Sequence, residues 1–374
     1  MGLSSSGRAL ALAFTETSKV YVRPFGILHG HRAKRAVTSG QGLPLAGVAA
    51  FTMCEIVVRN GCDLRSEQFP TCFLAKLETA VGQCLHARVR SVISRLTAIR
   101  ERTVLSRYSN PIIAGVVNVT PDSFYDGGKN SKTQIAISQA HRLIADGVDI
   151  IDIGGESSKP GAVPVTAEQE IERVIPVIKE VSGFGVPISI DTQKSSVMEA
   201  AVIAGASIVN DISALSADPK SLRLLRELGV PVILMHMQGT PVDMQNNPYY
   251  QFAPLDILEY LRNRIDVCLE SGISLSNIIV DPGIGFGKNL NHNVALLNRL
   301  SLFHSLRVPI AIGVSRKSFI ATLNEDEPPD QRLAGSLAMA IWACQQGVQI
   351  LRVHDVAETK QALKIYKAVV DDDL

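Results

Sequence analysis

The chain has 374 residues, of which 46% are hydrophobic, and its formal net charge at pH 7 is +1. A chain of this length and composition can bury a large core, so we expect a globular protein. Its balanced charge argues against a surface that binds nucleic acid by neutralising phosphates. No uncharged apolar run reaches the roughly 18 residues of a membrane-spanning helix. We therefore expect a small-molecule partner, no nucleic acid and no membrane.

The six cysteines are widely scattered, without a C-x-x-C pair or a nearby histidine pair at zinc spacing. Neither a zinc site nor a disulfide framework is indicated. A reducing compartment fits this usage best, and we expect a cytoplasmic location.

Residues 1–54 contain a single acidic residue, Glu16, and six basic residues. This composition resembles an organellar transit peptide, which would make the location organellar. A disordered extension or the remnant of an upstream domain explains it equally well. We expect residues 1–54 to be an extension outside the main domain.

Residues 55–109 are expected to form a helical linker. Between about residues 68 and 107, apolar side chains lie three and four positions apart, which predicts one or two amphipathic helices. We find no chemistry in this region, and its role stays open.

From residue 110 to residue 374, short apolar segments alternate with longer amphipathic ones, which predicts repeated βα units and a parallel sheet. The candidate strands are "IIAGVV", "VDIIDI", "PISI", "SIVN", "PVILM", "NIIV", "PIAIGV" and "QILRV". Eight strands in roughly 260 residues match a (β/α)8 TIM barrel, so the predicted fold class is α/β with an N-terminal extension.

Each candidate strand is followed by polar residues. In a parallel barrel these residues gather at the C-terminal mouth, where barrel enzymes place their active sites. A single Asp or Asn after a strand is more often a helix cap or a turn residue. Eight polar tails that together include carboxylates, amides, Lys, Arg and His favour an active site.

One part of this mouth suits a flat, nitrogen-rich heterocycle. Asp191, Asn210 and Asp281 follow the third, fourth and sixth strands. A carboxylate matches the two adjacent N–H donors of a guanidine-like ring edge. Phe286 could help to wall an aromatic ligand.

Another part of the mouth suits a phosphate-bearing ligand. Lys317, Arg352 and His354 follow the last two strands, and Arg and Lys are the usual phosphate-binding cations. Asn118 offers a neutral oxygen to Mg2+ that is held mainly by substrate phosphates and water. The loops 120–130 and 154–164 are candidate lids, with exposed connections as the alternative.

The motifs "NVTPDSF", "DIIDIGGESSKPGA", "ISIDT", "NDISAL", "MHMQGTP", "DPGIGFGK", "GVSRKS" and "RVHDV" resemble, in this order, those of the dihydropteroate synthase family. The resemblance spans about residues 111–370 and touches every predicted strand. It implies a folate-pathway transferase that joins 6-hydroxymethyl-7,8-dihydropterin pyrophosphate to 4-aminobenzoate with Mg2+ and releases pyrophosphate. It also implies a homodimer formed through helices near the C-terminal end, and sulfonamide sensitivity.

The resemblance also implies roles for single residues, four of which, Asp191, Lys317, Arg352 and His354, are the expected catalytic residues. The pterin would be held by Asp191, Asn210 and Asp281, and Lys317 would contact it next to the aminobenzoate site. Arg352 and His354 would bind pyrophosphate, and Asn118 would bind Mg2+. The remaining expected substrate-binding residues are Phe124, Ser158, Lys159, Pro160, Phe286 and Ser318.

The chain departs from the family pattern in one loop. It reads "ESSKPG", whereas the family commonly reads "ESTRPG", so Lys159 stands in place of the usual arginine. A lysine keeps the charge but loses bidentate geometry, and we expect weaker anchoring of an anionic group at this position.

Three other functions stay open from the sequence. Pterin-dependent methyltransferases bind a pterin in a similar barrel but need no diphosphate site, which "SRKS" and "RVHD" would supply. A non-enzymatic pterin-binding paralogue would keep the fold without the chemistry. A fusion with the preceding pyrophosphokinase of the pathway is the third, although residues 1–110 show no pattern of that kinase.

Overall fold

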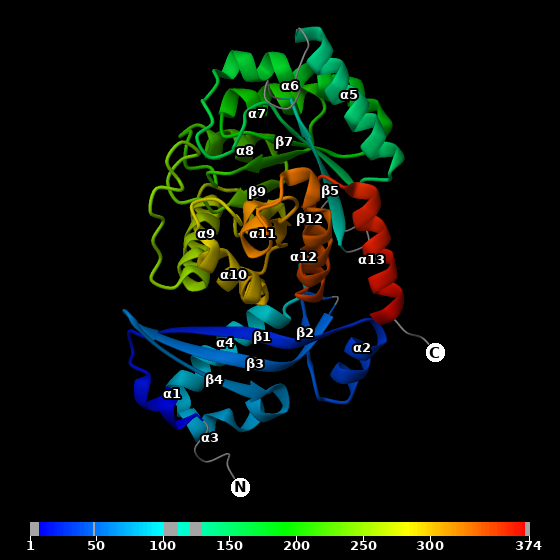
Figure 1. Ribbon diagram of the computed structural model, residues 1–374. Helices are drawn as coiled ribbons and strands as arrows, with labels where there is room; N and C mark the ends of the chain where they lie inside the picture. The colour runs from blue at the N-terminus through cyan, green and yellow to red at the C-terminus, as the bar shows by residue number, and fades with distance from the viewer. Residues whose placement is uncertain (1–6, 48, 101–110, 120–128, 371–374) are drawn as a thin grey trace.

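The protein is described here by a computed structural model, which covers residues 7–47, 49–100, 111–119 and 129–370. These residues form two units, an N-terminal domain built on a four-stranded antiparallel sheet and a C-terminal α/β barrel. The N-terminal domain lies below the barrel in Figure 1.

The barrel consists of eight parallel strands. They are β5 (Ile112–Asn118), β6 (Ile150–Gly154), β7 (Ile188–Asp191), β8 (Ile208–Asp211), β9 (Val232–Met235), β10 (Ile278–Asp281), β11 (Ala311–Gly313) and β12 (Ile350–Val353). Their order in the sheet is β10-β9-β8-β7-β6-β5-β12-β11. A parallel bridge between Val280 and Ile310 joins β10 to the segment before β11 and closes the sheet. The (β/α)8 barrel predicted from the sequence is confirmed.

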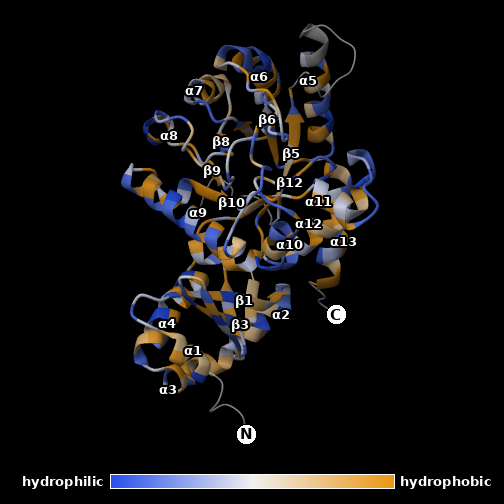
Figure 2. Cartoon of the chain, turned by 60° about the vertical axis from the view of Figure 1, so that its left-hand side comes forward, coloured by the Kyte–Doolittle hydropathy of each residue, from blue (hydrophilic) through white to orange (hydrophobic). Residues whose placement is uncertain are grey.

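Helices surround the barrel (Figure 1). They are α5 (Lys129–Ala145), α6 (Ala167–Val181), α7 (Ser195–Ala204), α8 (Ser221–Leu228), α9 (Ala253–Glu270), α10 (Leu290–Asn298), η6 (Leu300–Leu306), α11 (Ser318–Leu323), α12 (Leu333–Gln345) and α13 (Val356–Val370). In Figure 2, strand β5 is hydrophobic, whereas α6 carries hydrophilic residues on its outer side. None of the helices within the described ranges is long and apolar enough to cross a membrane.

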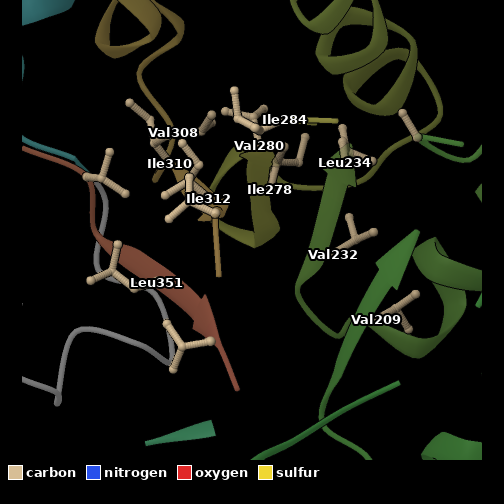
Figure 3. Close-up of a cluster of buried hydrophobic side chains, with 14 of the residues drawn as sticks. Val209, Val232, Leu234, Ile278, Val280, Ile284, Val308, Ile310, Ile312 and Leu351 are labelled. Atoms are coloured by element: carbon tan, nitrogen blue, oxygen red, sulfur yellow. The ribbon is translucent and has the colours of Figure 1, made fainter. Parts of the chain in front are cut away.

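Side-chain alternation along the strands gives the barrel two apolar layers. One set of strand residues, including Val209, Val280 and Ile312, packs outward in the large cluster shared with the helices (Figure 3). Their neighbours form a separate cluster inside the barrel, made of Ile112, Ala114, Ile150, Ile208, Ile233, Ile279, Ala311 and Ile350. The interior is therefore a packed core rather than a channel.

The N-terminal domain has strands of very different length. Its elements are α1 (Arg8–Ala13), β1 (Lys19–His29), α2 (Gly30–Thr38), β2 (Leu43–Leu45), β3 (Ala49–Asn60), β4 (Asp63–Pro70), η1 (Thr71–Lys76), α3 (Leu77–Val81) and α4 (Gln83–Thr97). Strand β3 is the centre of the sheet, because β1, β2 and β4 all pair with it in antiparallel fashion.

Both faces of this sheet are covered. On one face, Phe51, Ile56 and Phe69 pack against α3 and α4 in a core of their own. Residues on the other face, Tyr21 and Val57, join the hydrophobic cluster of the barrel. The sheet is thus packed between its own helices and the barrel.

The sequence-based division of residues 1–109 is therefore wrong. Most of the expected extension, from Gly7 onward, is folded, and its expected end at residue 54 falls inside β3. The expected helical linker begins with the second half of β3 and all of β4 before the helices α3 and α4. Strand β3 escaped prediction because it is buried on both faces, so it lacks the polar and apolar alternation of a half-exposed strand.

Candidate active site

The register of the barrel strands brings four sequence-distant residues into one row. Asn118 on β5 pairs with Gly154 on β6, Gly154 pairs with Asp191 on β7, and Asp191 pairs with Asn210 on β8. All four lie at the C-terminal ends of their strands. They form one rim of the barrel mouth.

The direction of the polar side chains follows from strand alternation. Two positions before Asp152, Asn210, Asp281 and Arg352 stand Ile150, Ile208, Ile279 and Ile350, which all belong to the interior cluster. Residues two apart on a strand point to the same face. The polar residues therefore form the next layer of the interior, above the isoleucines.

Arg352 is held by two carboxylates. Its Nε donates to Asp152 Oδ2 at 2.6 Å, and its Nη2 donates to Asp191 Oδ2 at 2.9 Å. Asn210 Nδ2 also donates to Asp152 Oδ2, at 3.4 Å. Asp152 Oδ1 is buried and has no hydrogen-bond partner among the described residues. The group joins the ends of β6, β7, β8 and β12.

Burial shifts the pKa values of the ionisable residues in this group. It raises the pKa of Asp191 to about 7, and the neighbouring Asp152 carboxylate adds to this rise against the opposing Arg352 cation. Burial also disfavours the Arg352 cation, but Asp152 and Asp191 more than offset this effect, so the pKa of Arg352 is raised. The guanidinium stays charged, while Asp191 can gain or lose a proton near neutral pH.

The opposite side of the mouth holds Asp281, Lys317 and Phe286. Asp281 Oδ1 accepts a hydrogen bond from the Gly283 backbone N–H at 2.7 Å. The Lys317 ammonium lies over the Phe286 ring, 4.2 Å from its centre. Burial, with Arg352 nearby, lowers the pKa of Lys317 to about 8. Burial raises the pKa of Asp281.

His354 lies after the end of β12 and contacts Ser315. The Ser315 hydroxyl lies 3.0 Å from His354 Nδ1 and accepts from the His354 backbone N–H at 3.2 Å. Burial and the Arg352 cation lower the pKa of His354 to about 4. At neutral pH His354 is therefore a neutral imidazole, which donates a single N–H to a ligand or to Ser315.

The loops after β9 and β10 are packed tightly together beside Asp281. Gly283 has φ 70°, and a Cβ there would stand 2.0 Å from the His236 carbonyl oxygen, so no other residue fits without movement. The buried Lys288 ammonium lies 2.9 Å from His236 Nδ1 and donates to the Phe286 carbonyl at 2.8 Å. These contacts make His236 a packed residue that supports the Phe286 loop.

Comparison with known proteins assigns this mouth to a family. Residues 114–354 match the family described as pterin binding enzyme. The dihydropteroate synthase of Escherichia coli strain K12 is 45% identical over 263 residues, which cover 70% of this chain and 93% of that protein. The chain belongs to the dihydropteroate synthase family. It is therefore a transferase of folate biosynthesis.

Solved structures of dihydropteroate synthases have the same barrel. The Yersinia pestis enzyme with a sulfonamide drug complex is 44% identical, with a TM-score of 0.67 over 70% of this chain and 95% of that one. The Xanthomonas albilineans enzyme with 4-aminobenzoic acid is 44% identical, with a TM-score of 0.66 over 70% and 93%. The same enzyme in complex with 7,8-dihydropteroate is 42% identical, with a TM-score of 0.64 over 70% and 94%.

The structure brings most of the expected site residues together. Asp191, Asn210, Asp281, Phe286, Lys317, Arg352 and His354 all lie around the mouth. Asn118 Oδ1 and Asp191 Oδ2 both lie within 4 Å of the place that a Cβ on Gly154 would take. Ser318 is exposed on the first turn of α11, directly after Lys317.

The expected site residues in the loop after β6 differ in their exposure. Ser158 lines a small hollow together with Asp191 and Thr192, whereas Lys159 and Pro160 are exposed. The Gly161 backbone N–H donates to the Pro241 carbonyl at 3.0 Å and so ties this loop to the one after β9. Phe124, predicted to line the aminobenzoate pocket, lies outside the described residues.

Two supporting groups were missed from the sequence. Asp152 stands within the "DIIDIGG" segment, and its position two residues after an inward isoleucine could have placed it in the polar layer. Lys194 donates to Glu156 at 2.9 Å and to the buried Glu170 at 2.7 Å, joining the loops after β6 and β7. Lys194 is well separated along the chain from Glu156 and Glu170, so no local sequence pattern indicates this second group.

Proposed function

We propose that this member of the dihydropteroate synthase family joins 6-hydroxymethyl-7,8-dihydropterin pyrophosphate to 4-aminobenzoate, giving 7,8-dihydropteroate and pyrophosphate. The observation that carries the proposal is the pairing of Arg352 with Asp152 and Asp191 in the mouth of a pterin-binding barrel. The bound 4-aminobenzoic acid and 7,8-dihydropteroate of the Xanthomonas structures support the choice of substrates.

The pterin would lie against the carboxylate layer. Asp191 and Asp281 can accept the N–H donors of its guanidine-like edge, and Asn210 can both accept and donate. Asp281 is buried and Asp191 is largely buried, and the pKa values of both are raised. A ring with several N–H donors would replace the hydrogen bonds that burial removes, so binding would stabilise the ionised carboxylates.

The bond to break joins the pterin methylene carbon to a pyrophosphate oxygen, which leaves with the electron pair. Positive charge then develops on the pterin and negative charge on the leaving group. The fixed Arg352 cation would stabilise the leaving oxygens, and His354 would donate its N–H to them. The aminobenzoate nitrogen attacks the methylene carbon and loses a proton. No nucleophile from the protein is required.

Asn118 is the residue that we propose for Mg2+. Its Oδ1 lies 3.8 Å from the place that a Cβ on Gly154 would take, beside Asp191 Oδ2, and could supply one neutral oxygen ligand. Within the described part of the chain, no three His, Cys, Asp or Glu side chains come together as a metal site. A Mg2+ ion bound mainly by the diphosphate and water fits this donor set. Such an ion would neutralise charge on the leaving group.

We also propose a homodimer formed through the C-terminal helices. Large apolar side chains are exposed there, with Ile365 and Val369 one turn apart on α13. Their exposed fractions are 61% and 67%. A dimer interface would cover them. Light scattering of the wild type and an Ile365→Glu variant tests this arrangement, because the variant should shift the mass toward that of a monomer.

The reaction is tested by measuring pyrophosphate release from the pterin substrate with Mg2+, with and without 4-aminobenzoate. We expect release that depends on aminobenzoate and yields dihydropteroate. Arg352→Ala should lower turnover by about 100- to 1,000-fold, as the loss of a transition-state donor does. Arg223→Ala is the matched control, because Arg223 is largely exposed on α8 and pairs only with Glu227 among the ion pairs of the described residues.

Tight pterin binding without turnover would contradict the proposal and favour a pterin-binding paralogue. Pterin-stimulated methyl transfer to a corrinoid protein would favour the methyltransferase reading. The site gives both readings less support, because Lys317, Arg352 and His354 would have no diphosphate to bind.

A further inference from the structure

A contact between the N-terminal domain and the active-site loops of the barrel lies at the end of β3. Arg59 stands there, one residue before the turn that leads into β4. Its side chain is 12% exposed and extends to the start of α9. Residues 7–97 precede the region matched by the family model, which begins at residue 114. The contact made by Arg59 is thus an addition to the family's barrel.

Arg59 binds two residues of the barrel at once. Its Nη1 donates to Asp256 Oδ1 at 2.6 Å, and its Nη2 donates to Gln251 Oε1 at 2.6 Å. The Nε of the same side chain donates to the Gly61 carbonyl at 3.1 Å, which fixes the guanidinium to the β3–β4 turn. Asp256 Oδ2 in turn accepts from the Phe252 backbone N–H at 2.9 Å. All three guanidinium nitrogens are used, so the fork has one orientation.

Gln251 belongs to the loop after β9, residues 236–252, which borders the active site. The two residues before it are hydrogen-bonded toward the mouth. Tyr249 exchanges two hydrogen bonds with Gln238, at 2.9 Å and 3.0 Å. The Tyr250 hydroxyl donates to the Gly287 carbonyl at 2.7 Å.

The same loop holds the turn that carries Phe286. Gln245 Nε2 donates to the Gly285 carbonyl at 2.8 Å. Gln245 and Tyr250 are therefore hydrogen-bonded to the residues on either side of Phe286. Phe286 in turn lies under the Lys317 ammonium. A continuous chain of contacts therefore runs from the N-terminal domain through the β9 loop to the active-site lysine.

We propose that Arg59 is a positioning residue for catalysis, which orders the loop 236–252 and thereby sets the place of Phe286 and Lys317. The proposal rests on the proposed function for its kinetic consequence. Its structural consequence, the order of the loop, does not depend on any activity. The N-terminal domain thus stabilises the active-site loop through Arg59.

Three other polar contacts between the described parts of the two domains do not involve the loop 236–252. Lys19 pairs with Glu259 on α9, and Arg23 donates to the Asn298 carbonyl at the end of α10. Arg100 lies 2.7 Å from His304 Nδ1 on η6. These contacts lie on helices and hold the domains together, whereas Gln251 lies in the loop itself.

The experiment compares Arg59→Ala with Arg65→Ala. Arg65 is an exposed arginine on the adjacent strand β4, opposite Val58, and it serves as the matched control. Hydrogen exchange of peptides covering residues 238–252 is measured together with kcat and KM for both substrates. We expect faster exchange in this loop and a decrease in kcat/KM of about 2- to 30-fold for Arg59→Ala only. Arg59→Lys should recover part of the loop's protection from exchange and part of kcat/KM, because an ammonium can keep the ion pair with Asp256.

Exchange and kinetics equal to those of Arg65→Ala would overturn the proposal. So would a variant whose exchange rises equally across the whole N-terminal domain, because that result shows general destabilisation. If Arg59→Ala does not fold, Gln251→Ala removes only the contact to the loop and leaves the Asp256 pair. Unchanged loop exchange in Gln251→Ala would then reject the idea. An inactive wild type would instead reject the proposed function. The exchange measurement would still test whether Arg59 orders the loop 236–252.

Discussion

The barrel mouth and the Arg59 contact between the two domains both contain partly buried charges, but their hydrogen bonding differs. At the interface, Arg59 uses all its guanidinium nitrogens on protein oxygens, and the nearby Asp256 uses both carboxylate oxygens. In the mouth, Asp152 Oδ1 has no partner within the described ranges, and the pKa values of Asp191 and Lys317 are shifted toward neutrality. Satisfied charges hold structure, whereas unsatisfied charges are ready for a ligand.

The largest effect that separates the two regions should come from Asp152→Asn. This change removes one of the two charges that hold Arg352 while keeping the shape of the side chain. We expect kcat/KM to fall by about 100-fold, as expected when one partner of a buried charge pair is lost. Steady-state kinetics measure the loss, with Asp63→Asn at the exposed start of β4 as control. Equal activity in both variants would show that Asp152 does not position Arg352.

Alanine substitutions of one glycine in each region should differ in their cost to stability. Gly283 in the mouth and Gly40 in the N-terminal domain have almost the same backbone angle, φ 70° and 71°. Either alanine costs roughly 1–2 kcal/mol of stability through the left-handed conformation. Only at Gly283 would the new Cβ meet the His236 carbonyl, while at Gly40 nothing lies within 4 Å. Urea unfolding should therefore show a larger loss for Gly283→Ala, by about 1–3 kcal/mol. Similar losses at both sites would contradict the tight packing of the loops.

Two residues of the mouth should make stability depend on pH. Asp191 has its pKa raised from 3.8 to about 7 by burial. Between these values the native state binds this proton and the unfolded state does not, so the contribution of Asp191 to stability falls as pH rises from about 4 to 7. His354, with its pKa lowered to about 4, contributes in the opposite direction up to its ordinary value of 6.5.

Asp191→Asn isolates the first of these contributions. Urea unfolding at pH 5 and pH 7.5 should show that the variant lacks the part of the stability loss that Asp191 causes in the wild type. The difference in unfolding free energy between variant and wild type should thus move in favour of the variant as pH rises. A pH-independent difference would argue against a raised pKa at Asp191.

The smallest effect is expected at Lys159. The structure places this residue on the exposed part of the loop after β6. Lys159→Arg would restore the bidentate fork that the family commonly has there, and we expect KM for the pterin pyrophosphate to fall by up to about fivefold, the size of an exposed ion pair. Identical kinetic constants for both substrates would contradict a role in anchoring an anionic group.

Much of the barrel was predictable because its signals are local. Each of the eight strands is a short apolar run with a polar tail, and each of the eight predicted segments overlaps a strand. Asp191, Asn210, Asp281 and Arg352 were found because they stand at strand ends, where the topology of a parallel barrel gathers them. Phe124 keeps its predicted role, since it lies outside the described residues.

Other features could not be predicted from local patterns. The strands β1, β3 and β4 lie in a region predicted to be an extension and a linker. For β3 the reason is that a strand covered on both faces loses its alternation. The pairing of Arg352 with Asp152 joins residues 200 positions apart, and that of Arg59 with Asp256 joins residues 197 apart. Only side-chain positions in the folded chain reveal such contacts.

The sequence by itself determined the barrel, its family and the identity of most polar residues at its mouth, because strand periodicity and strand-end motifs are encoded within a few residues. The tertiary structure alone decided which carboxylate holds Arg352, how burial shifts the pKa values of Asp191 and Lys317, and that the first hundred residues include a folded domain. Packing decides these features, since burial, charge pairing and sheet formation depend on residues that are distant in the chain and adjacent only after folding.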